Sequence, residues 1–373
     1  MIYPYKGVMA MKDLIFFPNP FGFGPTSKVI ALINVSKDIW NNVNIHYVAD
    51  DECQQIFNNK EIDVINANPR DYTQVEKILC GFSNPYVVSS LNRFAIRVAH
   101  EKGIPNCFID SLTWMWKEIP KEYLLTDLYF ALDFPGVNIV LNRYPSIIKV
   151  PYFIDKKAAS GHFVENDILV HVGGCINPLI KKCPESFLKL ICLAISKIKN
   201  KKILVSGGQE AVSFMSGFFD GKNVQCKTLK KEAFLSALLH TKHFVTTSGL
   251  NASLEAFNYG IPTSFLMPTN LSQWENLQVF DVYKAAPNKV TWEDIIEQNM
   301  NIHAQTEKAA IEIIIETADK VLEQPPLKKK CIELLEKVCM IIPDKQKQGE
   351  FIKSIGSNGA EVVAKILQEK WEL

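Results

Sequence analysis

Short apolar runs alternate with helix-length amphipathic segments along most of the chain, and this alternation constrains the fold more than any other feature. In the first half the runs are continuous and rich in β-branched and aromatic residues, as strands buried on both faces should be. These runs are 14–18, 44–49, 63–68, 85–90 and 106–111. One intervening amphipathic segment ends at Gly103, with Pro105 beyond it, which is a helix-stop signal. Such alternation predicts parallel sheets in a doubly wound α/β fold.

The same pattern restarts in the second half, after a polar stretch near 155–166 that contains glycine and alanine. Further strands are expected at 167–174, 202–208, 243–248 and 263–268. The sequence becomes helical after residue 290, and 373 residues is the length of about two domains. We therefore predict two Rossmann-like doubly wound domains that face a cleft, with helices at the C-terminal end. The N-terminal domain is expected over 1–158 and the C-terminal domain over 159–373.

Composition excludes several classes of partner. The formal net charge of +1 gives no electrostatic reason to bind a nucleic-acid polymer or an anionic membrane. No apolar stretch approaches the roughly 20 residues that a membrane-spanning helix needs, and the N-terminus carries no secretory pattern. The nine cysteines form no CxxC pair, so reduced thiols and a cytoplasmic location are expected. The histidines show no metal-ligand spacing, and His171 is expected in the core, so no metal or cofactor is predicted.

The most informative segment is 243–276, which predicts a strand, a tight turn and a helix. The strand ends at Thr247, and Ser248–Gly249 form the turn, so the free amides and positive end of the helix face the turn. Gly249 lets a bulky anion approach closely. Glu255 lies further along the helix, where its carboxylate can accept hydrogen bonds from two ribose hydroxyls. The alternative is that Ser248 only caps the helix and Glu255 is a solvated side chain.

The flanking polar residues fit the same interpretation. Asn251, like Ser248, is expected either to cap the helix or to donate to phosphate oxygens. The stretch after the next strand is expected to be a polar loop, and its amides Asn270, Gln273 and Asn276 are neutral hydrogen-bonding groups suited to sugar hydroxyls.

The run SGLNASLEAFNYGIPTSFLMPTNLSQWENLQVF, residues 248–280, resembles the donor-binding segment of GT-B glycosyltransferases. The inverting peptidoglycan N-acetylglucosaminyltransferase type is the most similar group. The resemblance places 248–251 against the donor diphosphate and Glu255 on the ribose, and it places Gln273 and Asn276 in a sugar-contacting loop. It also implies an inverting reaction, but it does not identify the donor.

Two glycine-containing turns agree with this resemblance. Gly173 and Gly174 follow the first predicted strand of the second domain, where these enzymes have a glycine-rich loop that faces the donor phosphates. Gly22, Phe23 and Gly24 follow the first strand of the chain, where GT-B enzymes carry a loop that approaches the acceptor. This second turn is not a G-x-G-x-x-G fingerprint, so an NAD site is poorly supported. It also lacks the histidine of the peptidoglycan enzymes, whose loop chemistry is therefore not carried over.

A third candidate site is the segment 106–120. Asp110 ends a predicted strand and is the candidate general base for the acceptor. Trp114 and Trp116 follow it, and their indoles can stack on a sugar or a base. The alternative is that Asp110 caps a helix and the tryptophans are core residues. The stretches GFGPTSK and DSLTWMW also resemble cytosylglucuronate synthase-like proteins, GT-B enzymes acting on a pyrimidine base, and this resemblance implies that both indoles stack on the acceptor.

The sequence thus predicts a metal-independent glycosyltransferase that moves a sugar from a nucleotide diphosphate-sugar, such as a UDP-sugar, to a small-molecule or nucleoside-type acceptor. The nucleotide-sugar is a co-substrate and not a cofactor. Two alternatives stay open at this point: a nucleotide-sugar 2-epimerase, and a non-catalytic nucleotide-sugar-binding protein on the same fold. The oligomeric state is also open, a homodimer included.

Overall fold

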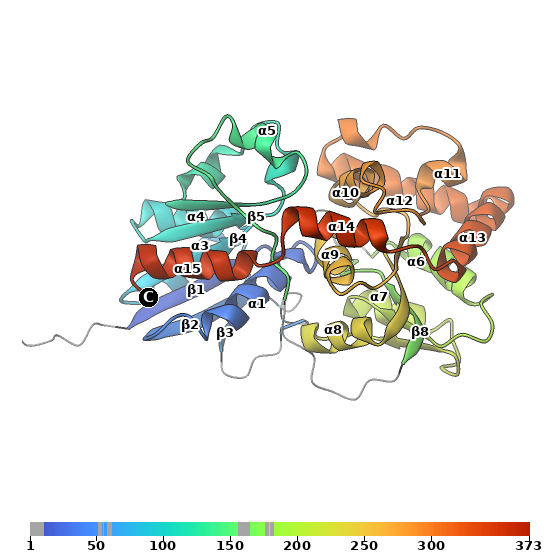
Figure 1. The fold of residues 1–373 in the computed structure, drawn as a ribbon, viewed down its shortest axis with the longest axis horizontal. Helices are drawn as coiled ribbons and strands as arrows, with labels where there is room; N and C mark the ends of the chain where they lie inside the picture. The colour runs from blue at the N-terminus through green and yellow to red at the C-terminus, as the bar shows by residue number, and fades with distance from the viewer. Residues whose placement is uncertain are drawn as a thin grey trace, which may run out of the picture.

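The computed structural model describes residues 11–50, 54, 56–57, 62–155, 165–175, 179 and 183–373. The chain forms two α/β domains, each built on a parallel sheet with helices on both faces (Figure 1). This confirms the predicted fold class. The predicted boundary between residues 158 and 159 lies outside the described residues and stays a prediction.

The N-terminal domain contains a seven-stranded parallel sheet in the order β3-β2-β1-β4-β5-β6-β7. Its strands are β1 (Lys12–Pro18), β2 (Val43–Ala49), β3 (Asp63–Asn66), β4 (Pro85–Ser90), β5 (Asn106–Asp110), β6 (Leu128–Leu132) and β7 (Ile148–Val150). Its helices are α1 (Gly24–Ser36), α3 (Tyr72–Cys80), α4 (Arg93–Glu101) and α5 (Val137–Leu141), with short 3-10 helices η1 (Thr113–Met115) and η2 (Lys121–Leu125).

The central strand β1 shows why the apolar runs are continuous. It pairs with β2 on one side and with β4 on the other, so it lies inside the sheet. Leu14 and Phe16 are buried in one apolar cluster, while Ile15 and Phe17 are buried in the cluster on the opposite face. A strand buried in this way has no polar face, as the sequence predicts.

The C-terminal domain contains a five-stranded parallel sheet in the order β10-β9-β8-β11-β12. Its strands are β8 (Asn166–His171), β9 (Ile203–Ser206), β10 (Val224–Lys227), β11 (Thr241–Thr246) and β12 (Thr263–Phe265). Its first helices are α6 (Glu185–Ile195), α7 (Gln209–Ser216), α8 (Lys231–Leu239) and α9 (Leu250–Asn258). The sequence did not predict β10, because this short edge strand is only partly buried and lacks a continuous apolar run.

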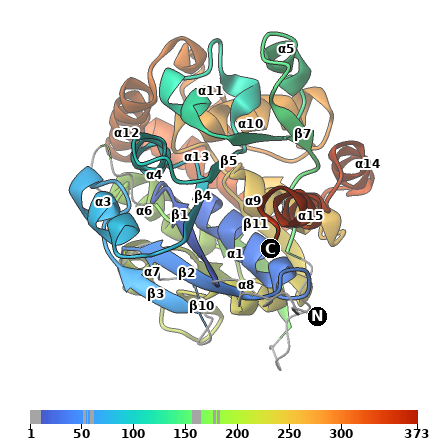
Figure 2. The same cartoon turned by 90° about the vertical axis from the view of Figure 1, so that its left-hand side faces the viewer.

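The rest of the chain is helical, as expected. It contains α10 (Leu271–Val282), α11 (Trp292–Ile296), η3 (Ile302–Ala304), α12 (Glu307–Glu323), α13 (Pro325–Met340), α14 (Gln346–Ile355) and α15 (Gly359–Trp371). The last helix returns to the N-terminal domain, where Figures 1 and 2 both show it beside α1. There Trp40 donates its indole N–H to the carbonyl of Ala364 at 2.8 Å. Every described helix is too short or too polar to span a lipid bilayer.

Both sheets have a topological switch point, where the strand order changes direction. In the first sheet it lies between β1 and β4, and in the second between β8 and β11. Ligands of open α/β sheets bind outside the carboxyl ends of the strands at such points. The two points meet across the interface, because a Cβ on Gly174, after β8, would lie 3.3 Å from the Cα of Gly22, after β1. This geometry positions the candidate site between the domains.

Candidate functional site between the domains

A cavity of about 510 Å³ lies between the domains. Its walls include the turns after β1, β8, β9 and β11 and the first turns of α1, α9, α10 and α12. All the residues that the sequence singled out for donor, acceptor and catalytic roles line it, except Asp110, Trp114 and Ser248. The volume is typical of small-molecule sites.

The first turn of α9 faces this cavity without a side-chain cap. Gly249 is the N-cap residue, and no side chain of the described residues accepts from the free amides there. Any residue can adopt the φ of −68° that Gly249 has, and a Cβ added to it would meet no described atom within 4 Å. Glycine therefore leaves the space in front of the helix open. Free amides and the positive end of a helix together form a seat for an anion.

Ser248 does not cap α9, which corrects one of its two sequence interpretations, and its predicted contact with the donor phosphates stays a prediction. Its hydroxyl donates to the carbonyl of Gln273 at 2.6 Å, and its own carbonyl accepts from Asn276 Nδ2 at 2.9 Å. These bonds tie the turn before α9 to the first turns of α10. Asn276 Oδ1 is buried without a partner among the described residues, so it is available to a donor group in the cavity.

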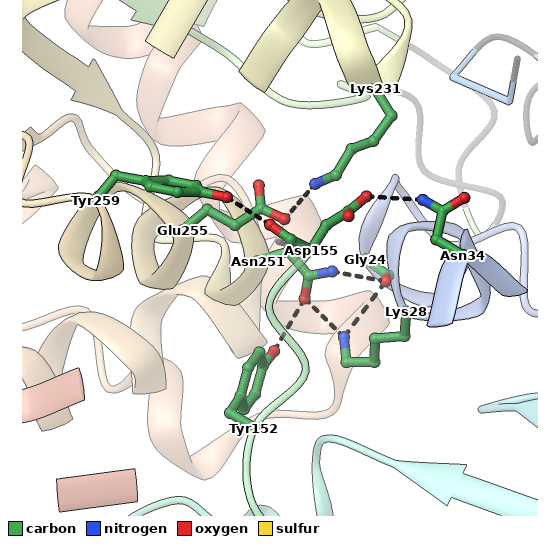
Figure 3. A network of polar contacts seen from close by, with 9 residues as sticks. All are labelled: Gly24, Lys28, Asn34, Tyr152, Asp155, Lys231, Asn251, Glu255 and Tyr259. Atoms are coloured by element: carbon green, nitrogen blue, oxygen red, sulfur yellow. Dashed lines mark hydrogen bonds and ion pairs between the residues drawn. The ribbon is translucent and has the colours of Figure 1, made fainter. Parts of the chain in front are cut away.

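Asn251 forms the bridge between the domains that Figure 3 shows. Its Nδ2 donates to the carbonyl of Gly24 at 3.0 Å. Its Oδ1 accepts from Lys28 Nζ at 2.7 Å and from the Tyr152 hydroxyl at 2.9 Å. Gly24 and Lys28 belong to α1, so the side chain of Asn251 is already engaged in holding the two helix N-termini together. Its predicted contact with phosphate stays a prediction.

Glu255 is buried rather than solvated, with 2% of its surface exposed, and it forms an ion pair with Lys231 through Oε1 (Figure 3). Burial raises the pKa of Glu255, and the Lys231 ammonium opposes this shift. Its Oε2 is buried and has no partner in the described part of the chain. A carboxylate oxygen in a cavity wall without a donor is an acceptor site for a ligand hydroxyl.

Lys28 places a second buried cation against the cavity. Its side chain donates to Asn251, and its ammonium lies 5.5 Å from the centre of the Tyr152 ring. Burial lowers the pKa of Lys28 to about 7, and the nearby Glu255 partly offsets this shift. An anion bound beside this group would raise its pKa, because the opposite charge favours the protonated form.

Two glycine pairs pack backbone against backbone: Gly173 and Gly174, which follow β8, and Gly207 and Gly208, which follow β9. The amide of Gly208 donates to the carbonyl of Gly173 at 2.8 Å. A Cβ on Gly208 would lie 2.2 Å from the carbonyl oxygen of Gly174, so a side chain cannot fit there. The close packing holds Gly173 and Gly174 in the cavity wall, next to the turn at Gly22.

The polar stretch after β12 is not a loop, which corrects the expectation for Gln273 and Asn276. Asn270 is the N-cap of α10, and its Oδ1 accepts from the amide of Gln273 at 2.9 Å. Gln273 Oε1 in turn accepts from the amide of Thr269 at 2.9 Å. The spacing Asn-x-x-Gln is a helix-start signal that identifies this boundary in the sequence. Asn270, Gln273 and Asn276 therefore line the cavity from a second helix N-terminus.

Asp110 is fully buried and does not line the cavity. Its carboxylate accepts from the indole N–H of Trp116 at 2.8 Å, from the amide of Leu112 at 2.6 Å and from the hydroxyl of Tyr129. Burial raises the pKa of Asp110, and these donors oppose the shift. Trp116 lines the cavity, whereas Trp114 packs on Phe134 with 4.8 Å between the ring centres.

Two lysines, a glutamate and a histidine of the cavity wall were missed as site residues by sequence reasoning. Lys28, Lys231 and Glu307 lie on helices, where their spacing does not distinguish them from solvated residues. His171 was expected in the core, but it ends β8 and faces the cavity. Its Nδ1 lies 2.9 Å from Ser206 Oγ, and burial lowers its pKa to about 4, so the ring is neutral at pH 7. Its place at the carboxyl end of a strand is the signal that identifies it.

No protein-family model matches the sequence, and no curated protein matches it. Solved structures match its fold over nearly the whole chain. One is a putative UDP-N-acetylglucosamine 2-epimerase from Listeria monocytogenes, with 12% identity, coverage of 98% of both chains and a TM-score of 0.57. A second is the spinosyn rhamnosyltransferase SpnG, with 9% identity, coverage of 96% of this chain and 100% of the other, and a TM-score of 0.56.

A third is a UDP-GlcNAc 2-epimerase from Neisseria meningitidis bound to UDP-GlcNAc, with 16% identity, coverage of 96% of this chain and 100% of the other, and a TM-score of 0.55. At these identities the likeness shows the fold alone. The chain has the two-domain GT-B fold, which is shared by glycosyltransferases and by nucleotide-sugar epimerases.

Proposed function

We propose that the protein is a glycosyltransferase that uses a nucleotide diphosphate-sugar as donor and a small molecule as acceptor. One observation carries this proposal: the N-terminus of α9 opens into the interdomain cavity beside two buried lysines and a carboxylate, and among the described residues it has no side-chain cap and one carboxylate oxygen has no partner. The helix end and the lysines match the charge of a diphosphate. The free oxygen of Glu255 matches the ribose hydroxyls.

In this proposal the donor lies along the C-terminal domain. Glu255 Oε2 accepts from the ribose, and the amides after Gly249 bind the diphosphate. Lys28 supplies positive charge from the N-terminal domain, and the amides of α10 orient the sugar. The cations and helix ends stabilise the leaving diphosphate, so a bound metal ion is not required for that step. We therefore expect turnover to persist when divalent metals are removed with a chelator.

The acceptor side of the cavity is aromatic. Phe23, Trp116 and Tyr123 line it from the N-terminal domain, which favours a planar or ring-containing acceptor such as a nucleoside. Asp110 orients Trp116 through the indole hydrogen bond. The assignment of Asp110 as general base stays a prediction, because its carboxylate is buried behind Trp116 and Tyr129.

The reaction is proposed as one in-line displacement with inversion. An acceptor oxygen or nitrogen bonds to the anomeric carbon as the bond from that carbon to the diphosphate breaks. The nucleotide diphosphate leaves with the electron pair, and the proton of the acceptor passes to a base. Closure of the two domains excludes water, which would otherwise hydrolyse the donor.

Binding of nucleotide diphosphates gives the first test. Uridine, thymidine, guanosine and cytidine diphosphates are compared by the rise in melting temperature, because a ligand of the folded state stabilises it by mass action. One of them is expected to raise the melting temperature, and its sugar conjugates should then be turned over with a panel of ring-containing acceptors. If none of the diphosphates binds, the proposal is wrong.

A nucleotide-sugar 2-epimerase is the second candidate, and the fold likeness to two such enzymes favours it. Among the described residues, the carboxylates lining the cavity are Glu255 and Glu307, and Glu255 is already paired with Lys231. Incubation of the nucleotide-sugar in heavy water without an acceptor separates the candidates. An epimerase forms the epimer with deuterium at C2, whereas a glycosyltransferase leaves the sugar unchanged. Binding with neither reaction would instead indicate a non-catalytic binding protein.

A further inference from the structure

Glu307 is a charged group of the cavity to which the donor-binding scheme above assigns no role. It is the first residue of α12, a long helix that follows the sheet of the C-terminal domain. Its side chain lines the cavity, and the backbone amides of Leu271 and Ser272, the first two residues of α10, act on its carboxyl and lower its pKa. The carboxylate therefore lies beside the N-terminus of α10, against which α12 packs.

One oxygen of this carboxylate is not used by the protein. Glu307 Oε1 is buried and has no hydrogen-bond partner in the described parts of the chain. Burial raises the pKa of Glu307 to about 7, opposed by the amides of Leu271 and Ser272. A buried acceptor oxygen at a cavity wall is costly unless a ligand satisfies it. The atom therefore indicates a hydrogen-bond donor on the ligand.

The position of Glu307 relates it to one part of the proposed donor. Ser248 and Asn276 tie the turn before α9 to α10, so the diphosphate seat and the N-terminus of α10 are neighbours. Glu255 lies on α9, whereas Glu307 begins α12, which packs against α10. The order from Glu255 to α9 to α10 follows the order of ribose, diphosphate and sugar in the donor. Glu307 thus lies at the sugar end.

The surroundings of Glu307 limit the kind of sugar. The next turns of α12 present Ile311 and Ile314 to the same cavity, and the lysines lie near α9 instead. A carboxylate among apolar side chains accepts well from a hydroxyl. It disfavours a second carboxylate, because two like charges that lie close together repel each other.

Resting on the proposed function, we infer that Glu307 determines donor specificity: it accepts a hydrogen bond from a hydroxyl of a neutral hexose and disfavours a hexuronate. Glu307 then contacts the sugar without contacting the nucleotide. The inference goes beyond the sugar-contacting amides on α10, since it gives the site a charge preference.

The experiment compares Glu307→Gln with wild type by calorimetry. The probes are the nucleoside diphosphate that stabilises wild type most and its conjugates with glucose, galactose, N-acetylglucosamine and glucuronic acid. Glu312→Gln is the matched control, because it makes the same change at an exposed position of the same helix. Melting temperatures of all variants show whether the packing against α10 is kept.

Wild type is expected to bind its best neutral conjugate at least about tenfold more tightly than the glucuronate, as the penalty for an unpaired buried charge predicts. Glu307→Gln should leave the affinity for the diphosphate within about twofold of wild type. It should weaken the binding of the neutral conjugate about tenfold, and so reduce the difference in affinity between the neutral conjugate and the glucuronate. Equal losses for the diphosphate and its conjugates would overturn the inference, as would a wild type that binds the glucuronate as tightly as the neutral sugars. A wild type that binds no diphosphate would overturn the proposed function itself.

Discussion

At the scale of single residues, the cavity combines buried charges that only a ligand fully satisfies. Glu255 and Lys231 are paired, and both are almost completely buried. Taking two charges out of water is costly, and the pair recovers that cost only while both partners are present. The carboxylate keeps one oxygen without a partner among the described residues, so part of the cost remains in the free protein. Such incomplete satisfaction is typical of a binding site.

The coupling in this pair can be measured through stability. Lys231→Met leaves the Glu255 carboxylate buried without its cation, so we expect the free energy of unfolding in urea to fall by about 3–5 kcal/mol. Adding Glu255→Gln should recover a large part of that loss, because the uncompensated charge is then gone. Losses that simply add in the double variant would show that the two side chains do not act as a pair.

Lys28 predicts a pH dependence of donor binding. Its pKa is about 7 in the free protein, so rising pH removes its charge before a donor binds. A bound diphosphate favours the charged form, and binding above pH 7 therefore requires uptake of a proton. The affinity for a nucleotide-sugar, whose two phosphates are esterified and keep their charge, should fall as the pH rises from about 6.5 to about 8.5.

The control for this prediction is Lys28→Met, which should bind more weakly and lose most of the slope with pH. Glu307 also has a pKa of about 7, so the series is repeated with Glu307→Gln, in which the affinity should still fall as the pH rises. Calorimetry in buffers of different ionisation enthalpy counts the protons directly. A slope that persists in Lys28→Met would assign the titration to another group.

At the scale of elements, the position of a glycine decides whether its replacement lowers the stability of the fold or the affinity for the ligand. Gly249→Ala adds a Cβ where the described structure is empty and φ is ordinary, so the melting temperature should change little. The same Cβ occupies the approach to the α9 amides, so affinity for the diphosphate should fall roughly tenfold or more. Gly208→Ala is the opposite case, since its Cβ overlaps the carbonyl of Gly174 and should cost about 1–3 kcal/mol of stability. Equal effects of both variants on melting temperature would contradict this distinction.

The elements also show how far the sequence predicts this structure. The sequence predicts the turn at Ser248–Gly249 and a helix after it, and α9 begins directly after that turn at Leu250. The sequence also placed the two glycine turns at the cleft. It did not reveal the pair of Lys231 with Glu255 or the bond from Lys28 to Asn251, because these contacts join segments far apart in the chain. Nor did it show that Trp116 and Tyr129 enclose Asp110, because that depends on packing beyond the strand end.

At the scale of the whole molecule, the first and the last described elements, β1 and α15, lie in the same domain. Lys12 Nζ, at the start of β1, donates to the carbonyl of Trp371 at 2.6 Å, and the Trp371 ring lies 5.3 Å from that of Tyr86. The C-terminal sheet is therefore inserted between β7 and α15, and the chain crosses the interface twice. The bridge at Asn251 adds a further link between the domains, made by side chains.

This arrangement predicts that a destabilising substitution in α15 lowers the stability of the N-terminal domain. Trp371 is 7% exposed, and Trp371→Ala should cost about 3–5 kcal/mol, as truncation of a large buried side chain does. Hydrogen exchange followed by mass spectrometry should show faster exchange in β1, β2 and α1, while β8, β9 and β11 keep their protection. Lys370→Ala, at an exposed position of the same turn, is the control and should change neither. Equal loss of protection in both sheets would mean that the two domains unfold as a single unit, and that the interface with its Asn251 bridge is as stable as either core.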